Sequence, residues 1–277
     1  MMLQNLCRLN CSWDDDIPQV YQSQWAKWQE DLKKLGTFRV ARCLKPKGFG
    51  QVVSARLHHF SDACENGYGT VSYLRLQDDS EQIHLSFILG KARVAPLKKV
   101  TIPRLELTAA VLAVRIDRLL KAELQLKLEN STFWTDSTPV LKYIQNETKR
   151  FHTFVANRIS FIREATAISQ WRYIDTRQNP ADEASRGVNV EYLLSHSRWI
   201  YGPDFLFKNE SNWPSSAANS PFISNDDPEV KKEATVNTVV SKSSQNATDQ
   251  LITYFSSWKR LKMAAVCFLQ TLQGKAW

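Results

Sequence analysis

The spacing of apolar and polar residues changes along the chain. From residue 51 to about residue 90, short runs of aromatic, β-branched and leucine residues are separated by the turn-forming sequences GYG (67–69) and DDS (78–80). Such runs are typical of strands, and strands joined by tight turns form an antiparallel meander. Three strands are predicted, at residues 51–61, 70–76 and 83–89.

A helical period follows. From Pro103 to Leu120, leucine, isoleucine and alanine residues form a wide apolar stripe without an internal glycine, which predicts one long helix. Asn179-Pro180 is a good start for another helix. Strands that alternate with helices after a meander predict an α/β fold with a mixed five-stranded sheet flanked by helices. The remaining elements are strands at 131–135 and 170–174 and helices at 137–143 and 151–166.

Amphipathic helices are predicted at both ends of the chain. Aromatic and leucine residues of the segment 21–35 recur at spacings of three and four, after Pro18 and before Gly36. We interpret this helix as a packing element and expect a short strand after it, at 37–44. A second amphipathic helix is predicted at 251–270; because nothing follows it that it could pack on, we expect a truncated module.

Composition divides the chain into four segments. The stretch from residue 209 to about residue 245 is rich in serine, asparagine, proline and charge, which predicts a flexible linker. We therefore expect a helical arm at 1–50, a central domain at 51–190, an aromatic segment and flexible linker at 191–250, and the amphipathic helix at 251–277.

The overall charge favours a polyanionic partner without proving one. The chain has 277 residues, a formal net charge of +8 and five scattered cysteines, with no second Cys/His pair at zinc-finger distance from Cys7 and Cys11. We expect free thiols in a reducing compartment. No signal peptide and no apolar run long enough to cross a membrane is visible, so the expected location is intracellular, in the cytoplasm or nucleus, with no membrane partner.

Four acidic residues stand where strands end or helices begin. Asp62 follows the first predicted strand, and Asp136 follows the fourth. Glu106 lies in the first turn of the long helix, and Asp182 lies in the first turn of the last helix. Such positions meet at one edge of an α/β sheet, where four carboxylates would repel one another unless cations compensated them. Oxygen ligands favour Mg²⁺, and two such ions form the arrangement that cleaves phosphodiesters in line.

Each acid also has a structural interpretation. An aspartate after a strand is commonly a turn or cap residue, and a glutamate in the first helical turn is favoured by the helix dipole. Asp182 could support its helix start, in which case Glu183 could take its place as a ligand. The joint pattern of four acids in one domain favours the metal site.

The motifs around these acids resemble a known family. The segments FSDA (60–63), LELTAA (105–110), WTDS (134–137) and NPADEASRG (179–187) look like the ribonuclease H domain of Pao/BEL-type LTR retrotransposon polyproteins. The flanks resemble the parts of that polyprotein between its reverse transcriptase and its integrase. The resemblance implies a ribonuclease H-like fold and a site made of Asp62, Glu106, Asp136 and Asp182. It also implies an endonuclease that cuts the RNA strand of RNA–DNA hybrids with two Mg²⁺ ions, or with Mn²⁺ in their place.

Partners and contacts follow from that expectation. The substrate is an RNA–DNA hybrid, and the reverse transcriptase and integrase parts of the same polyprotein are further candidate partners. The histidine that assists product release in many ribonucleases H is missing from the stretch 171–176. Phosphate, sugar or 2′-hydroxyl contacts are expected from basic and small polar residues near the acids. These are Asn66, Lys98, Lys99, Arg104, Ser137, Thr138, Lys149 and Arg150.

Two other functions compete with the nuclease. A catalytically silent nucleic-acid-binding remnant of a retrotransposon polyprotein would have the same fold, because fold does not settle function. It would bind hybrids without magnesium and would not cut them with it. An integrase-type transferase is the third interpretation, but that family has its glutamate last, whereas Glu106 is second here.

Overall fold

Five strands form one mixed sheet in the order β3-β2-β1-β4-β5. In this computed structural model β1, β2 and β3 are antiparallel neighbours, while β4 runs parallel to β1 and β5 parallel to β4. The predicted mixed five-stranded α/β sheet is confirmed. The strands are β1 (Val52–Ala63), β2 (Gly67–Asp78), β3 (Ile83–Val94), β4 (Thr132–Thr135) and β5 (Trp171–Tyr173).

The structure describes residues 2–195, 198–214, 222–232 and 252–272. The chain divides into two compact units, Met1–Lys232 and Glu233–Trp277. The α-helices are α1 (Met2–Arg8), α2 (Gln19–Lys34), α3 (Ile102–Glu123), α4 (Thr138–Gln145), α5 (Thr153–Ala165), α6 (Asp182–Arg186), α7 (Val190–Leu194), α8 (Arg198–Tyr201) and α10 (Trp258–Leu272). Short 3-10 turns lie at Leu35–Thr37, Ile168–Gln170, Thr176–Gln178, Asp204–Phe207 and Glu210–Asn212.

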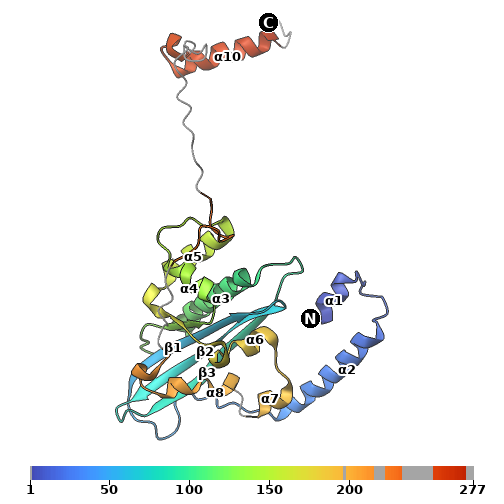
Figure 1. Cartoon of the computed structure of the whole chain (residues 1–277), viewed down its shortest axis with the longest axis vertical. Helices are drawn as coiled ribbons and strands as arrows, with labels where there is room; N and C mark the ends of the chain where they lie inside the picture. Colours follow the sequence, from blue (N-terminus) through green and yellow to red (C-terminus); the bar gives the residue numbers. More distant parts are fainter. Residues whose placement is uncertain (1, 196–197, 215–221, 233–251, 273–277) are drawn as a thin grey trace. The chain divides into compact units, whose positions relative to one another are not determined.

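Helices α3, α4 and α5 cover one face of the sheet (Figure 1). The apolar stripe of α3 packs on β1 and β2, and α5 packs on α3. Leu107, Val114, Phe133, Val155 and Ile162 are completely buried in this layer. Each such side chain contributes roughly 1.5–3 kcal/mol through burial, and this packing holds α3 against β1 and β2.

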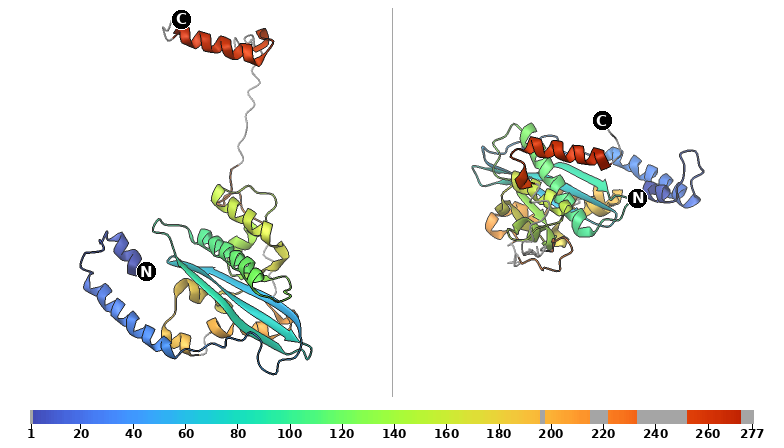
Figure 2. Two further views of the ribbon diagram at one scale, coloured as in Figure 1. Left: turned by 180° about the vertical axis from the view of Figure 1, so that it is seen from behind. Right: turned by 90° about the horizontal axis from the view of Figure 1, so that it is seen from above.

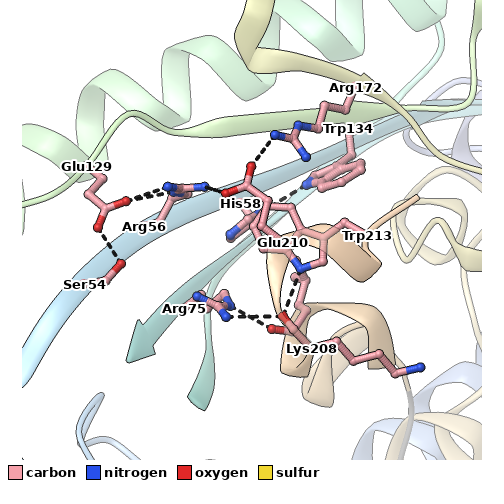
Figure 3. Close-up of polar contacts among 11 residues, drawn as sticks. Ser54, Arg56, His58, Arg75, Glu129, Trp134, Arg172, Lys208, Glu210 and Trp213 are labelled. Carbon is pink, nitrogen blue, oxygen red and sulfur yellow. Dashed lines mark hydrogen bonds and ion pairs between the residues drawn. The ribbon is translucent and has the colours of Figure 1, made fainter. Parts of the chain in front are cut away.

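The segment after α8 covers the opposite face. Phe205, Leu206 and Trp213 are buried against the sheet. The Arg75 side chain in β2 donates from Nε to the Leu206 carbonyl oxygen at 2.9 Å, and Arg172 lies over the Trp213 ring at 5.3 Å (Figure 3). Residues 203–214 therefore belong to the sheet domain, although the pattern predicts that the flexible linker begins at 209.

A second part of the predicted linker also packs on the domain. Ile223 and Val230 are buried in the core formed with α4 and α5, and Phe151 forms a β-bridge with Val230. The linker prediction is too long because apolar residues spaced among polar ones still supply anchors. The rest of the predicted linker, at 215–221 and 233–250, lies outside the described residues.

Three local predictions differ from the structure. The segment 37–44 forms no strand; most of its side chains are exposed, so it has no apolar face to bury. The first turn of the meander lies at 64–66, and GYG (67–69) instead begins β2. The predicted C-terminal helix has one short helical turn at 252–254 and a bend at 256–257 before α10. In the described part of the chain, no helix is long and apolar enough to cross a membrane.

Candidate active site

The sheet brings the predicted acids to one edge. Asp62 is the penultimate residue of β1, and Asp136 directly follows β4. The two strands are parallel neighbours with Ser61 opposite Thr135, so Asp62 and Asp136 are the next pair in register. Neighbouring strands lie about 4.8 Å apart, which places these two aspartates side by side.

Asp62 is surrounded by protein and by negative charge. It is 5% exposed and accepts a hydrogen bond at Oδ2 from Ser185 Oγ. Burial raises the pKa of Asp62 to about 7; the hydrogen bond from Ser185 opposes this, whereas the charges of Asp136 and Asp182 add to it. Asp136 and Asp182 are therefore each close enough to Asp62 for their charges to disfavour its ionisation, as the sequence pattern predicts.

Glu106 reaches the same cluster as the fifth residue of α3, which begins one residue before the predicted start at Pro103. Its Oε2 accepts a hydrogen bond from Ser137 Oγ at 2.5 Å. Burial raises the pKa of Glu106, and the charge of Asp136 raises it further against the effect of Ser137. Ser137 also caps α4 by accepting from the Val140 amide at 3.3 Å, so this buried serine is occupied by protein groups.

Asn179 connects the ends of β1 and β4. Its Nδ2 donates to Asp136 Oδ1 and to the Ser61 carbonyl oxygen, each at 3.2 Å. Asn179 Oδ1 accepts from the Ala181 amide at 3.1 Å and so shapes the entry into α6. The sequence pattern predicts only a helix start at Asn179-Pro180. The contact of Asn179 with Asp136, 43 positions earlier in the chain, was missed because it depends on how the strands pair.

Asp182 is the first residue of α6. Arg186 Nε lies 2.5 Å from Asp182 Oδ1, but in an orientation that does not satisfy this oxygen, which is buried without a hydrogen-bond partner. The ion pair supplies charge compensation, while the oxygen keeps its capacity to accept. An unsatisfied buried carboxylate oxygen on a residue whose charge acts on Asp62 fits a cation.

Glu183 points into a different network. One oxygen accepts from Tyr192 Oη at 2.7 Å and from Arg198 Nε at 3.1 Å. Tyr192 and Arg198 belong to α7 and α8. Glu183 therefore joins α6 to the segments that follow it, and Asp182 is the acid of α6 that raises the pKa of Asp62.

Two glycines position α6 against the sheet. A Cβ atom on Gly69 would lie 2.5 Å from the Ala184 Cβ, and one on Gly67 would lie 3.0 Å from the Ser185 carbonyl oxygen. The GYG sequence thus permits close approach of a helix. That approach brings Ser185 to Asp62.

The four acids together form an all-oxygen donor set. As the side chains stand, no group of three or more His, Cys, Asp or Glu residues in the described ranges is arranged to hold a metal ion. Each of the four is instead engaged by a protein group, which is Ser185, Ser137, Asn179 or Arg186. Charge, burial and the unsatisfied oxygen of Asp182 fit a hard divalent cation, but binding would require these side chains to turn from their present partners.

The predicted substrate-binding residues divide into two groups. Asn66, Lys98 and Lys99 are exposed, in the turn after β1 and in the loop before α3. Thr138, the first residue of α4, is half-buried and follows Ser137. Asn66 and Thr138 thus lie within four residues of Asp62 and Asp136 in the chain.

The other predicted basic residues contact the segment 222–232, although the Arg150 side chain is exposed. Arg104 forms a paired contact with Glu229, Nε to Oε1 at 2.6 Å and Nη2 to Oε2 at 3.0 Å. Lys149 donates to the Asn225 side chain, and the Arg150 carbonyl oxygen accepts from the Lys231 amide at 2.7 Å. This segment therefore covers part of the basic surface that the sequence predicts for substrate.

Comparison with known proteins agrees with this architecture. Residues 1–137 match the family model described as Pao retrotransposon-like RNaseH-like domain. No curated protein gives a significant match to the sequence.

Solved ribonuclease H structures resemble the chain only distantly. The N-terminal RNase H domain of Rv2228c from Mycobacterium tuberculosis is 12% identical, with 48% of this chain and 92% of that chain covered and a TM-score of 0.32. RNase H1 from Halobacterium salinarum NRC-1 is 12% identical, with 52% and 98% covered and a TM-score of 0.31. LC11-RNase H1, solved in complex with an RNA/DNA hybrid, is 14% identical, with 50% and 99% covered and a TM-score of 0.33.

Proposed function

Because residues 1–137 belong to the Pao retrotransposon-like RNaseH-like family, we propose that this chain is a divalent-metal-dependent endonuclease that cleaves the RNA strand of RNA–DNA hybrids. The observation that carries the proposal is the convergence of Asp62, Glu106, Asp136 and Asp182 at one sheet edge. Two of these acids raise the pKa of a third. The substrate class comes from the family, and the chemistry comes from the acids.

The four acids would bind the metal ions, and neighbouring polar residues would orient the acids. Asp62, Glu106, Asp136 and Asp182 supply carboxylate oxygens, which Mg²⁺ and Mn²⁺ favour. When bound, two such ions activate a water nucleophile and stabilise the leaving 3′-oxygen. Ser185, Ser137 and Asn179 orient the carboxylates through hydrogen bonds, and partners of this kind tune ligand geometry.

Metal binding at the four acids should depend on the protonation state of Asp62. Without a cation, burial and mutual repulsion raise the pKa of Asp62 to about 7, so this carboxyl is partly protonated near neutrality. A divalent cation favours the ionised form, and metal binding would release a proton. Metal affinity should therefore rise with pH through the range in which Asp62 ionises.

The polyprotein setting is part of the proposal. In the family, the domain lies between a reverse transcriptase and an integrase, and we propose that the exposed apolar faces of α2 and α10 pack on such neighbours. Trp25, Trp28, Val266 and Phe268 are each at least 44% exposed. Exposed apolar rows of this kind mark interaction surfaces.

The test is a substrate panel at fixed ionic strength. RNA–DNA hybrid, double-stranded RNA and double-stranded DNA of one sequence, each labelled on either strand, are incubated with Mg²⁺, Mn²⁺ or EDTA. The proposal requires metal-dependent cutting of the RNA strand of the hybrid alone. Hybrid binding in EDTA without cleavage in either metal would instead support the silent binding remnant.

A further inference from the structure

A row of arginines runs along α3, away from the acids. Arg104 precedes Glu106 by two residues, and Arg115 and Arg118 follow at positions that share the helix face of Arg104 and Thr108. With a rise of 1.5 Å per residue, the row from Arg104 to Arg118 is about 21 Å long. It begins at the proposed catalytic site and extends well beyond it.

Helix α5 adds a fourth arginine to the row. Arg158 Nε donates to Thr108 Oγ1 at 3.3 Å. Its guanidinium carbon lies 3.4 Å from the centre of the Phe154 ring, and that of Arg104 lies 5.1 Å from the same ring. Phe154 therefore holds two guanidinium groups near each other, at the end of the row closest to Glu106.

A second phenylalanine repeats this arrangement further along α5. The guanidinium carbons of Arg115 and Arg118 lie 5.5 and 4.7 Å from the centre of the Phe161 ring. Aromatic rings orient guanidinium groups by cation–π contact without neutralising their charge. Arg104 is neutralised by Glu229 instead, and Arg158 donates from Nε to Thr108 and from Nη1 to the Phe154 carbonyl oxygen. Arg115 and Arg118 pair with no carboxylate among the described residues.

The row borders a groove of about 500 Å³. Arg115, Asn157 and Arg158 line it from the helices, and Tyr68 and Arg93 line it from β2 and β3. Tyr68 and Arg93 are directly opposite each other in the β2–β3 pair. Figure 2 shows α3 lying along the sheet beside these strands. The groove therefore opens next to the end of the sheet that carries Asp62.

Negative charge is scarce around this groove. Among the residues that the structure describes, Arg93, Arg115, Arg118 and Arg158 form no ion pair with a carboxylate, and Arg104 pairs with Glu229 alone. Burial lowers the pKa of Arg158, and repulsion by Arg115 and Arg104 lowers it further, against an opposing effect of Tyr68. Gathering like charges costs free energy that a bound anion would offset.

We propose that this groove, the arginine groove, binds the phosphate backbone of a nucleic acid strand at a site separate from the four acids. Guanidinium groups match phosphate geometry in paired hydrogen bonds. One strand of B-form DNA carries a charge every 3.4 Å along the helix axis, so a row of about 21 Å spans about six phosphates. The inference rests on the proposed function for the identity of the strand, which would continue from the hybrid that reaches the acids.

The test measures binding without metal, so that cleavage plays no part in it. Fluorescence anisotropy follows a 5′-labelled 20-nucleotide single-stranded DNA and the matching RNA–DNA hybrid in EDTA, between 50 and 300 mM salt. The variants are Arg115→Gln and Arg115→Gln/Arg158→Gln. The matched control is Arg39→Gln/Arg42→Gln, which removes two exposed positive charges from the N-terminal arm. Circular dichroism and melting temperature establish that each variant folds.

The salt slope separates a backbone contact from a general loss of charge. Each phosphate contact contributes about 0.7 to the slope of log K against log salt for single strands and about 0.9 for duplexes. We expect Arg115→Gln to lower the slope by about one contact and weaken binding several-fold, and the double variant to lower it by about two. If both folded variants keep the slope and affinity of the control, the arginine groove does not bind nucleic acid. Cleavage by the native chain could still stand in that case.

Discussion

Ser185 in α6 donates a hydrogen bond to Asp62 at the end of β1, across 123 positions of sequence. This contact joins the last motif of the chain's central domain to the first. It lowers the pKa of a carboxyl that burial and neighbouring charge raise to about 7. Ser185 is therefore a positioning residue for the proposed metal site.

Removal of that hydroxyl should weaken metal binding. In Ser185→Ala, Asp62 loses the hydrogen bond from this hydroxyl and its pKa rises. We therefore expect metal affinity to fall about 10- to 100-fold and the pH at which metal binding strengthens to move upward. Titration of Mn²⁺ at several pH values measures both effects. Ser160→Ala, an exposed serine of α5, is the control; equal metal affinity and pH dependence in the two variants would rule out this role.

Gly69 should be intolerant of a methyl group. A Cβ there would meet the Ala184 Cβ at 2.5 Å, so Gly69→Ala must push α6 away from β2 and move Asp182 and Ser185. We expect roughly 1–3 kcal/mol of destabilisation and weaker metal binding. Chemical denaturation measures the first effect. Gly36→Ala, where nothing lies within 4 Å, is the control, and a Gly69→Ala variant as stable as this control would contradict the packing argument.

Asp117 should make folding sensitive to acid. Although burial opposes ionisation, hydrogen bonds from His59, Ser131 and Lys121 lower the pKa of this carboxyl to about 2. Since its pKa in the unfolded chain is near 3.8, its stabilising contribution is present above pH 4 and is lost as pH falls toward 2.

The variant Asp117→Asn tests that assignment. It should lower the free energy of unfolding by about 1–3 kcal/mol at neutral pH and flatten the decline in stability between pH 4 and pH 2. Urea unfolding at a series of pH values measures both. An unchanged acid profile in the variant would show that another carboxylate governs it.

Glu229 should restrain Arg104. Glu229 is 4% exposed and pairs with an arginine two residues from Glu106. Glu229→Gln breaks this ion pair and should lower the free energy of unfolding. Because Arg104 is partly exposed and water can solvate it, we expect a loss of only about 1–3 kcal/mol. If freed Arg104 then contacts phosphate, the salt slope of hybrid binding should rise by about 0.9. A lower or equal slope, measured against Glu164→Gln, would mean that the segment 222–232 does not compete with substrate.

The sheet and the positions of the four acids could be predicted from the sequence because both depend on local signals. Strand ends and helix starts are marked by turns, caps and period changes, and Asp62, Asp136 and Asp182 lie at such marks. The start of α3 was predicted one residue too late, because a helix boundary shifts by a residue or two without changing the pattern.

Other parts of the site depend on contacts between distant segments. The pairing of Asn179 with Asp136 and of Ser185 with Asp62 needs the β1–β4 register and the approach of α6 over Gly69. The packing of Trp213 and Val230 was missed because single apolar residues in a polar stretch give no periodic signal. The arginine groove combines two helices and two strands, so no window of sequence contains it.

The central claim is that the four acids hold a metal that cleaves RNA in a hybrid. The most direct measurement is the initial rate of cleavage of a 5′-labelled RNA–DNA hybrid in Mg²⁺ by the native chain, Asp136→Asn and the control Glu164→Gln, an exposed glutamate of α5. We predict cutting of the RNA strand by the native chain and the control and at least a hundredfold loss, on the order expected for a metal ligand, in Asp136→Asn. A folded Asp136→Asn variant that cuts as fast as the control, or a folded native chain that does not cut, would contradict the account.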